Sequence, residues 1–491
     1  MSVQAVRVYA VSCTLTAAAQ KSCRSSGTSR AQSVDGCEYY CMRAALALMA
    51  AVVAEGLRVS RRVAVVGGGS AGVTAARMLK QAGHRPNIFE TGASFGGVWA
   101  NEPTNSVVYK NLRTNLPKQV MQSPDLDFPA SLPSYVDARA LGDYIAAYAE
   151  KFNVDATFGA RVLHVTPLPE GRWAVEYETS KGRATEEYDG VVVCSGHYEA
   201  PYAPDIPGQR EWLRGDRSVA HSISYNEPAP YAGKSVLIVG GRSSGVDVAR
   251  ELQGVAAWTY IIEKKCLKVA SDAERRVTHA PVGAKLAANG HLYFEGEIVP
   301  GPSIDRVILA TGYVYSFPFL DEVTTGLQFA DRRSCRPLFL HLQHAERPTL
   351  GFVGIQLAVP CPIPTFEAQA RYLGEAWATD DGALTPLDER RSWVAQRLAT
   401  VEASGREQDL HYTTAEGSSA WAYIRELVRA APPPPQASWL DSDTFDARLS
   451  TVEAIYRDRG ARYPTKPWHD DAYRRCEYSV DWAIGAWDVA C

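Results

Sequence analysis

A glycine-rich turn between a short apolar strand and a helix occurs twice in this chain, and this repeat constrains its fold more than any other feature. The first turn, residues 67–72, follows the apolar run 62–66 and opens an amphipathic helix that reaches Lys80. A second apolar run, 86–89, then ends at Glu90. Strand, turn, helix and strand in this order are typical of a βαβ unit.

The second unit repeats the pattern. Its strand is 236–239, its turn is 240–245, its helix opens at 246–252, and a further apolar strand, 260–262, ends at Glu263. In both units the acidic residue lies 23 positions after the first glycine of the turn (90 − 67 and 263 − 240). The repeat predicts an α/β chain with two Rossmann-like dinucleotide-binding domains.

Each glycine of the first turn has a separate task. Gly67 permits the tight turn, Gly69 lets the backbone approach a pyrophosphate, and Gly72 lets the helix pack closely on the strand. The free N–H groups of the helix then face the phosphates, and Glu90 binds the ribose hydroxyls. In the second turn Gly240 and Gly245 keep the outer positions, but the middle position holds Arg242. The second domain could therefore also be a Rossmann-shaped unit that has lost its nucleotide.

Two nucleotides in one chain indicate an internal reaction in which a nicotinamide gives hydride to a flavin. A disulfide reductase would place a CxxxxC pair shortly after the first unit, but this chain has Gly-Gly-Val-Trp-Ala-Asn-Glu at 96–102. Dioxygen is then the expected electron acceptor. No Ser/His/Asp arrangement stands out, and the sequence 341–344, His-Leu-Gln-His, lacks the glutamate of a zinc helix, so we expect a surface loop or strand there.

Composition excludes several classes of protein. The 491 residues are enough for two or three domains, and 51 basic against 55 acidic residues argue against nucleic-acid binding. The longest apolar run, 44–54, is shorter than the roughly 20 residues of a membrane-spanning helix, so no integral span is expected. The ten cysteines form no CxxC pair, and we expect reduced thiols. Residues 1–58 have the character of a leader or targeting segment, which leaves a cytoplasmic or an organellar location open.

Further motifs along the chain resemble the flavin-containing monooxygenase family, from about Arg62 to about Arg371 and more weakly to about Arg429. They are, in order, the first turn with the Phe-Gly-Gly-Val-Trp at 95–99, the Tyr-Lys-Asn-Leu-Arg-Thr-Asn-Leu-Pro at 109–117, the segments 193–198 and 204–208, Ser244-Gly245-Val246-Asp247, the Ala-Thr-Gly-Tyr at 310–313, and the segments 351–354 and 366–371. The chain departs from the family in the spacing between Gly215 and His221, which is five residues instead of three. Lys264 also stands where the family usually has arginine.

The resemblance implies a FAD domain in two parts, 59–208 and 313–430, with an NADPH domain at 209–312 inserted between them. A Pro-rich linker and C-terminal extension of unclear role would fill 431–491. The resemblance further implies that Asn115 is catalytic, because its amide can bind both NADP and the reduced, oxygenated flavin. The cofactor-binding residues it implies are Gly67, Gly69, Ser70, Ala71, Gly72, Glu90, Gly97, Val98, Trp99, Thr114, Asn115, Leu116, His221, Tyr225, Gly240, Ser244, Gly245, Val246, Asp247, Lys264, Thr311 and Gly312.

The function implied is that of an NADPH-dependent monooxygenase similar to N,N-dimethylaniline monooxygenase. A C4a-hydroperoxyflavin would transfer one oxygen atom of dioxygen to a soft nucleophilic sulfur or nitrogen of a small molecule. Three alternatives stay open: a Baeyer–Villiger monooxygenase, an uncoupled NADPH oxidase, and a non-catalytic flavin-binding protein. The substrate is not identified, a homodimer is left open, and no metal is expected.

Overall fold

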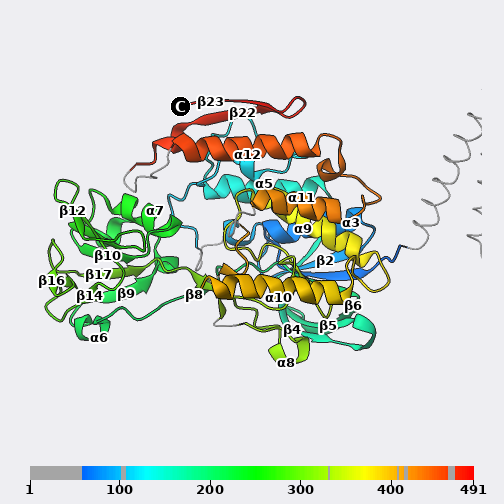
Figure 1. Ribbon diagram of the computed structural model, residues 1–491, viewed down its shortest axis with the longest axis horizontal. Helices are drawn as coiled ribbons and strands as arrows, with labels where there is room; N and C mark the ends of the chain where they lie inside the picture. Colours follow the sequence, from blue (N-terminus) through cyan, green and yellow to red (C-terminus); the bar gives the residue numbers. More distant parts are fainter. Residues whose placement is uncertain (1–57, 101–106, 330–331, 406–408, 414–418, 463–469) are drawn as a thin grey trace, which may run out of the picture. The chain divides into compact units, whose positions relative to one another are not determined.

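The computed structural model describes residues 58–100, 107–329, 332–405, 409–413, 419–462 and 470–491 (Figure 1). The chain divides into two compact units, Met1–Val59 and Ser60–Cys491. The predicted leader, 1–58, lies outside the described residues except for Arg58. The fold below is therefore that of the second unit.

A seven-stranded sheet forms the centre of the larger domain. Its order is β19-β20-β21-β7-β1-β2-β3. β1 (Arg62–Val66) lies between β2 (Arg85–Glu90) and β7 (Gly190–Val193), and both pairings are parallel. The remaining strands are β3 (Ala156–Phe158), β19 (Leu338–Phe339), β20 (Gln343–His344) and β21 (Leu350–Phe352). Because buried parallel strands read as continuous apolar runs, the sequence located β1 and β7 correctly.

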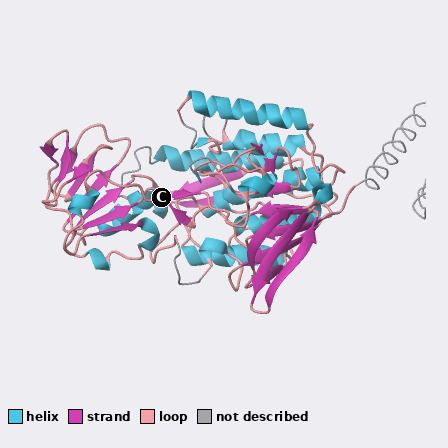
Figure 2. Cartoon of the chain, turned by 90° about the horizontal axis from the view of Figure 1, so that it is seen from below, coloured by secondary structure: helices cyan, strands magenta, loops and turns pink. Residues whose placement is uncertain are grey.

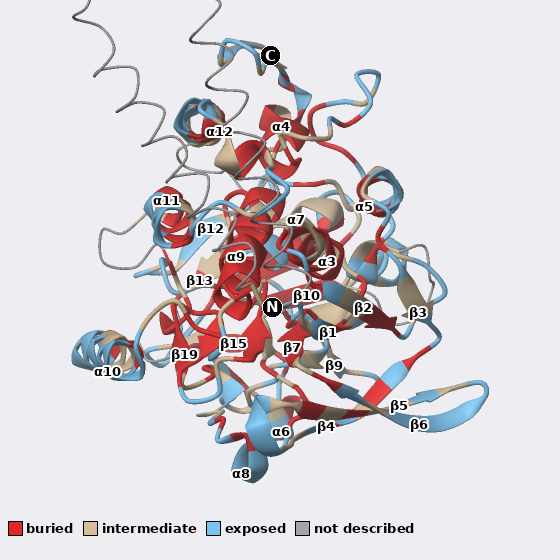
Figure 3. Cartoon of the chain, turned by 90° about the vertical axis from the view of Figure 1, so that its right-hand side faces the viewer, coloured by how far each residue is buried: buried red, intermediate tan, exposed pale blue. Residues whose placement is uncertain are grey.

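Helices α3 (Ser70–Gln81), α5 (Ala138–Lys151) and α9 (Pro362–Trp377) pack with this sheet, α3 directly against α9. α9 is buried over almost its whole length, as Figure 3 shows. Its Glu367 is fully buried and accepts hydrogen bonds from Arg77 on α3 (2.8 Å), Tyr148 on α5 (2.6 Å) and Trp439 (2.6 Å). A buried carboxylate is tolerated because these donors compensate for its lost hydration.

The second sheet is an insertion. Its order is β12-β13-β11-β10-β17-β9, and strands dominate this part in Figure 2, at the left. The strands are β9 (Ser218–His221), β10 (Ser235–Val239), β11 (Trp258–Ile262), β12 (Ala270–Asp272), β13 (Val277–Ala280) and β17 (Arg306–Leu309), and α7 (Ser243–Leu252) follows β10. The chain enters beside β8 (Ala200–Pro201) and returns through β18 (Tyr313–Val314), which pairs antiparallel with β8. The two Rossmann-like domains are therefore present, as predicted.

A three-stranded antiparallel sheet, β4 (Arg161–Pro167), β5 (Trp173–Thr179) and β6 (Gly182–Tyr188), lies outside the two larger sheets. Trp173 anchors it, since this side chain is buried and its indole N–H donates to Thr349 Oγ1 at 2.9 Å. Before and after the chain's last proline run, 432–435, the helices α11 (Ala420–Ala430) and α12 (Phe445–Arg462) contribute Ile424, Leu449 and Ile455 to the core of the larger domain.

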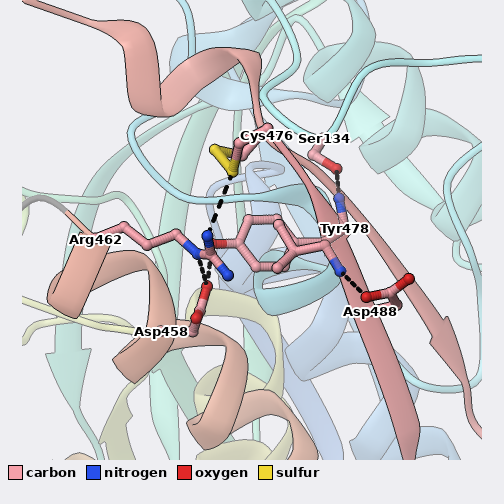
Figure 4. Close-up of a disulfide and its surroundings, with 8 residues drawn as sticks. Ser134, Asp458, Arg462, Cys476, Tyr478 and Asp488 are labelled. Carbon is pink, nitrogen blue, oxygen red and sulfur yellow. Dashed lines mark hydrogen bonds and ion pairs between the residues drawn. A yellow bond between two sulfur atoms is a disulfide. The ribbon is translucent and has the colours of Figure 1, made fainter.

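The C-terminal hairpin corrects the expectation that all cysteines are reduced. β22 (Glu477–Asp481) pairs antiparallel with β23 (Ala486–Ala490), and a disulfide between Cys476 and Cys491 closes the open end of the hairpin (Figure 4). A two-stranded hairpin is marginal by itself, and a cross-link restricts its unfolded state. The spacing gave no hint of this pair, because only strand register brings the two ends together. Cys194, Cys266, Cys335 and Cys361 are free.

A second correction concerns the expected surface segment 341–344. His341 and His344 are both buried, and His344 belongs to β20. Burial lowers the pKa of both imidazoles, that of His344 to about 4. We expected a surface loop or strand because the segment lacks the glutamate of a zinc helix, but helix α10 (Leu387–Ala403) packs on β19 and covers this region. Among the described helices, none has the length and apolar content needed to span a bilayer.

Candidate active site

The first turn shows the three expected glycine geometries, each with its own cause. Gly67 has φ +107°, and an added Cβ would lie 2.6 Å from the Cys194 carbonyl oxygen. A Cβ on Gly72 would lie 1.8 Å from the Gly67 carbonyl oxygen, so the helix packs directly on the turn. Gly69 differs from both, with an ordinary extended backbone (φ −75°) and no atom closer than 3.5 Å to an added Cβ. Nothing in the protein itself requires glycine at position 69.

Glu90 holds the turn from the end of β2. One carboxylate oxygen accepts the Gly68 backbone N–H at 2.6 Å and the other accepts the Gly92 N–H at 2.6 Å. The oxygen that accepts from Gly92 also accepts the Thr91 hydroxyl at 3.2 Å, whereas the oxygen bonded to Gly68 keeps a further lone pair that can accept a ribose hydroxyl. The side chain is buried, and the turn and the acidic residue therefore act as one rigid element.

The segment 97–99, a short 3-10 helix, closes over the turn. Gly97 has φ +58°, and a Cβ there would lie 2.9 Å from the Gly69 Cα atom. The Trp99 carbonyl oxygen rests on α5, where a Cβ on Gly142 would lie only 2.4 Å from it. Val98 is exposed and Trp99 half-buried. The sequence motif at 95–99 therefore approaches the first turn. Gly142 was missed in the sequence analysis, because its role depends on the close contact with the Trp99 carbonyl oxygen.

The segment 114–116 lies between the two turns. Thr114 is buried, its backbone N–H donates to the Val136 carbonyl at 2.9 Å, and its hydroxyl has no partner among the residues that the structure describes. Asn115 is exposed, and its side-chain amide lies 3.5 Å from the hydroxyl of Ser243, the first residue of α7. Leu116 packs against the core of the larger domain. Asn115 therefore joins the first nucleotide-binding domain to the turn of the second.

The second turn repeats the outer glycines closely. Gly240 has φ +115° with an added Cβ 2.2 Å from the Ala310 carbonyl oxygen, and a Cβ on Gly245 would lie 1.8 Å from the Gly240 carbonyl oxygen. Arg242 holds the middle position in the same extended backbone as Gly69 (φ −91°), with its side chain exposed. The arginine therefore turns outward without backbone strain. Ser244 is exposed and Val246 half-buried at the start of α7.

The acidic residue of the second unit has a partner that sequence reasoning missed. Glu263 follows β11, and its carboxylate pairs with Nδ1 of His279 on the neighbouring strand β13 at 2.9 Å. The other carboxylate oxygen lies against the turn, 2.4 Å from where a Cβ on Gly241 would be. Lys264 and Lys265 follow and are exposed. Parallel pairing of β11 and β13 places His279 here, and a sequence without strand register could not show it.

His221 and Tyr225 lie where the inserted domain joins the larger one. His221 Nε2 contacts the Gly312 carbonyl at 3.0 Å, and Nδ1 accepts the Ile223 N–H at 3.2 Å. Burial lowers the pKa of this imidazole. Gly312 itself has φ +84°, and the Thr311 hydroxyl donates to the Tyr202 carbonyl. Tyr225 is buried and donates to Glu251 at 2.7 Å. These four residues lie at the domain junction, whereas the two turns and the segment 114–116 lie where Asn115 approaches Ser243.

Comparison with known proteins decides the family. A family model described as flavin-binding monooxygenase-like matches residues 60–274 and 285–380. The chain belongs to this family. A flavin-containing monooxygenase of Arabidopsis thaliana named FMO GS-OX-like 2 is 30% identical over 84% of this chain and 92% of its own length, and FMO GS-OX4 of the same plant is 29% identical over the same shares.

Several solved structures have a similar fold. The S-allyl-L-cysteine S-oxygenase from Allium sativum superposes with a TM-score of 0.71 at 26% identity, and covers 84% of this chain and 96% of its own. Tmm from a Pelagibacter strain has a TM-score of 0.67 at 19% identity over 87% of this chain and 95% of its own, which shows the fold alone. A cyclohexanone monooxygenase superposes less closely, with a TM-score of 0.53 at 14% identity over 75% of this chain and 97% of its own.

A flavin fits the residues that this monooxygenase presents. At Gly69 the backbone is extended and an added Cβ would only touch Gly97, at 3.5 Å, and the N–H groups that begin α3 are available to a pyrophosphate. The buried Thr114 hydroxyl has no partner among the described residues. The N–H donors of the turn and the Glu90 acceptor are the groups that a dinucleotide needs.

A last group of contacts surrounds Asp247 on α7. Its carboxylate accepts the Tyr109 hydroxyl at 2.8 Å, pairs with Arg250 at 2.5 Å, and pairs with Arg474 at 3.0 Å. Burial first, and then the Asp247 charge, raise the pKa of Tyr109, so its hydroxyl stays a donor. The expectation that Asp247 takes part in coenzyme binding stays a prediction, and the structure shows that protein groups contact its carboxylate. Arg474 lies 227 positions away in the sequence, and no motif pointed to it.

Proposed function

We propose that this chain is an NADPH-dependent flavoprotein monooxygenase that transfers one oxygen atom to a soft nucleophile, with thioether sulfur as its first substrate class and amine nitrogen as its second. The observation that carries the proposal is the 3.5 Å approach between the Asn115 amide and Ser243 Oγ, which joins the flavin side and the coenzyme side of one site. Sulfur is placed first because a solved relative of 26% identity is named an S-oxygenase. The finer resemblance to N,N-dimethylaniline monooxygenase supports the amines.

Each group of site residues has a different role in the proposed reaction. The first turn and Glu90 hold the flavin's pyrophosphate and ribose, and the second turn with Lys264 holds the coenzyme. When bound, the flavin takes two electrons from NADPH and uses dioxygen so that one oxygen atom enters the substrate and the other leaves as water. Asn115 donates its amide hydrogens across the site and fixes the nicotinamide against the flavin. The buried junction at His221 and Gly312 keeps the two domains in register and limits entry of water.

The deciding experiment is anaerobic reduction of the yellow holoprotein by NADPH, followed by air and a panel of substrates. The panel contains S-allyl-L-cysteine, N,N-dimethylaniline and cyclohexanone, and hydrogen peroxide is measured per NADPH. We expect bleaching by NADPH and a sulfoxide as the main product. A ketone-derived ester would indicate a Baeyer–Villiger enzyme, peroxide equal to NADPH would indicate an oxidase, and absence of bleaching would indicate a non-catalytic flavoprotein.

Asn115→Ala tests the residue that carries the proposal. Loss of the amide should leave flavin reduction nearly unchanged but raise the share of NADPH that ends as hydrogen peroxide several-fold, because one donor that would orient the bound cofactors and exclude water is removed. Asn111→Ala is the matched control, since Asn111 is an exposed asparagine of the same segment. Equal peroxide yield from both variants would remove Asn115 from the catalytic site.

A further inference from the structure

The C-terminal residues carry a side chain into the contact between the two nucleotide-binding domains. Arg474 belongs to the short 3-10 helix Ala472–Arg475, and its side chain is 7% exposed. Its Nε donates to the Thr114 carbonyl at 3.2 Å, and its Nη2 lies 3.2 and 3.0 Å from the two oxygens of Asp247. One rigid guanidinium therefore joins the flavin-side segment to helix α7.

These contacts are adjacent to the contact that matters for the reaction. Thr114 directly precedes Asn115, and Asp247 lies one helical turn after Ser243. The Asn115–Ser243 approach and the Arg474 bridge are therefore two parallel links between the same two elements. A change in the distance that Arg474 sets between Thr114 and Asp247 therefore also changes the distance between Asn115 and Ser243.

Asp247 does not need Arg474 for its own charge balance. Arg250 pairs with it from the same helix at 2.5 Å, and the Tyr109 hydroxyl donates to it at 2.8 Å. Burial, which lowers the pKa of Arg474, is outweighed by Asp247, and the net shift is upward, so the guanidinium stays charged. What the arginine adds is a connection that neither Arg250 nor Tyr109 makes, namely that to the Thr114 carbonyl.

The rest of the hairpin holds this arginine in place. Tyr478 N–H donates to Ser134 Oγ at 2.7 Å, as Figure 4 shows, and the Ser134 N–H donates to Glu477 at 2.8 Å. The disulfide of Cys476, two residues after Arg474, closes the same hairpin. The hairpin is thus fixed to the larger domain, and the arginine extends from it toward α7.

We propose that Arg474 is a positioning residue for hydride transfer, one that sets the distance between the Asn115 segment and the coenzyme turn. This inference rests on the proposed function, because it gives the C-terminal residues a role in that same site. The effect is expected on the rate of flavin reduction and on coenzyme affinity, with little effect on flavin content. A misplacement of about 1 Å can reduce a rate by roughly 100-fold, so we expect a 10- to 100-fold slower reduction in the absence of the guanidinium.

The test compares Arg474→Met, Arg474→Lys and the control Arg475→Met, in which a neighbouring exposed arginine is replaced. Anaerobic bleaching by NADPH, NADP⁺ affinity by calorimetry, and hydrogen–deuterium exchange of residues 107–116 and 240–252 are measured on each holoprotein. Arg474→Met should slow bleaching, weaken NADP⁺ binding and speed exchange in both segments, while thermal stability and FAD content stay close to those of the control. Arg474→Lys should restore NADP⁺ affinity but only part of the rate, because an ammonium cannot reach both partners in one plane.

Equal bleaching rates and equal exchange in Arg474→Met and Arg475→Met would overturn the proposal. If Arg474→Met fails to bind FAD, the lysine variant decides. If the charge of Arg474 were only structural, Arg474→Lys would restore both the rate of flavin reduction and the rate of hydrogen exchange completely. A wild-type protein that NADPH does not bleach would instead refute the proposed function, and the exchange data would still show whether Arg474 joins the two segments.

Discussion

The two glycine-rich turns have nearly the same backbone and different middle residues. Gly67 and Gly240 both have positive φ, and the third glycines, Gly72 and Gly245, both lie where a Cβ would be 1.8 Å from a carbonyl oxygen of their own turn. Gly69 and Arg242 share an extended backbone that any residue adopts. Glycine at the outer positions is therefore required by the fold, whereas at the middle position only a ligand can require it.

The outer glycines of the motif therefore indicate the shape of the turn, whereas the middle glycine indicates binding of a pyrophosphate. The second turn keeps the shape with Arg242 turned outward, so a missing middle glycine does not remove the Rossmann-like turn. Whether it weakens the approach of a pyrophosphate is a separate question. Substitutions at matched positions of the two turns can answer it.

The largest effect is expected at the third glycine. Gly72→Ala places a Cβ on the Gly67 carbonyl at the centre of the larger sheet, and overpacking against a backbone atom should cost about 3 kcal/mol or more. The variant should yield little soluble yellow protein. Gly245→Ala creates the same clash in the inserted sheet, and it should keep FAD but lose reduction by NADPH. Equal flavin content in both variants, measured by absorbance at 450 nm, would contradict the prediction that the first turn alone determines flavin binding.

The middle glycine should affect binding without loss of the fold. Gly69→Val meets an allowed backbone and no atom closer than 3.5 Å to its Cβ, so we expect a folded protein by circular dichroism. The added side chain occupies the side open to the pyrophosphate, and flavin occupancy should fall more than about tenfold. Arg242→Val is the matched control and should keep full flavin occupancy. A stoichiometric yellow Gly69→Val protein would refute the assignment of this turn to FAD.

Acid should distinguish the two sheets by their histidines. Burial lowers the pKa of His197, His344 and His411 in the larger domain to about 4. Because the unfolded chain binds these protons first, at a pKa near 6.5, stability present above pH 6.5 is lost as the pH falls toward 4. The loss between pH 7 and pH 5 should be about 5 kcal/mol for the three together.

Urea unfolding at the two pH values measures this loss, and hydrogen exchange assigns it to a domain. The larger domain should open first in acid, because these three buried imidazoles all belong to it. His344→Gln should reduce the pH dependence by about one third. His164→Gln, at an exposed histidine, should leave it unchanged. Identical unfolding midpoints at pH 7 and pH 5 would show that these imidazoles are protonated in the folded protein.

The sequence was sufficient for features that depend on neighbouring residues. Apolar runs located β1 and β10, and the glycine spacing located both turns, because strand, turn and helix are local in the chain. His279 and Arg474 were missed, since their contacts depend on strand register and on a hairpin from the far end of the chain. The Cys476–Cys491 pair and the burial of His341 were predicted wrongly for the same reason. Tertiary contacts place these residues, and no local pattern encodes them.

The smallest effect is expected in coenzyme choice, where the two acidic residues differ. Glu90 is buried and bonded to its own turn, while Glu263 is partly exposed beside Lys264 and Lys265. A carboxylate about 4 Å from a 2′-phosphate costs roughly 1 to 4 kcal/mol, and the two lysines offset part of this repulsion. We therefore expect preference for NADPH with measurable use of NADH. Glu263→Ser should raise the NADPH-to-NADH ratio of kcat/KM about tenfold, and Lys264→Glu should reverse the preference. Lys268→Glu, another exposed lysine in the same loop, is the control. If Lys264→Glu behaves like this control, the phosphate is bound elsewhere, and Arg242 is the next residue to replace.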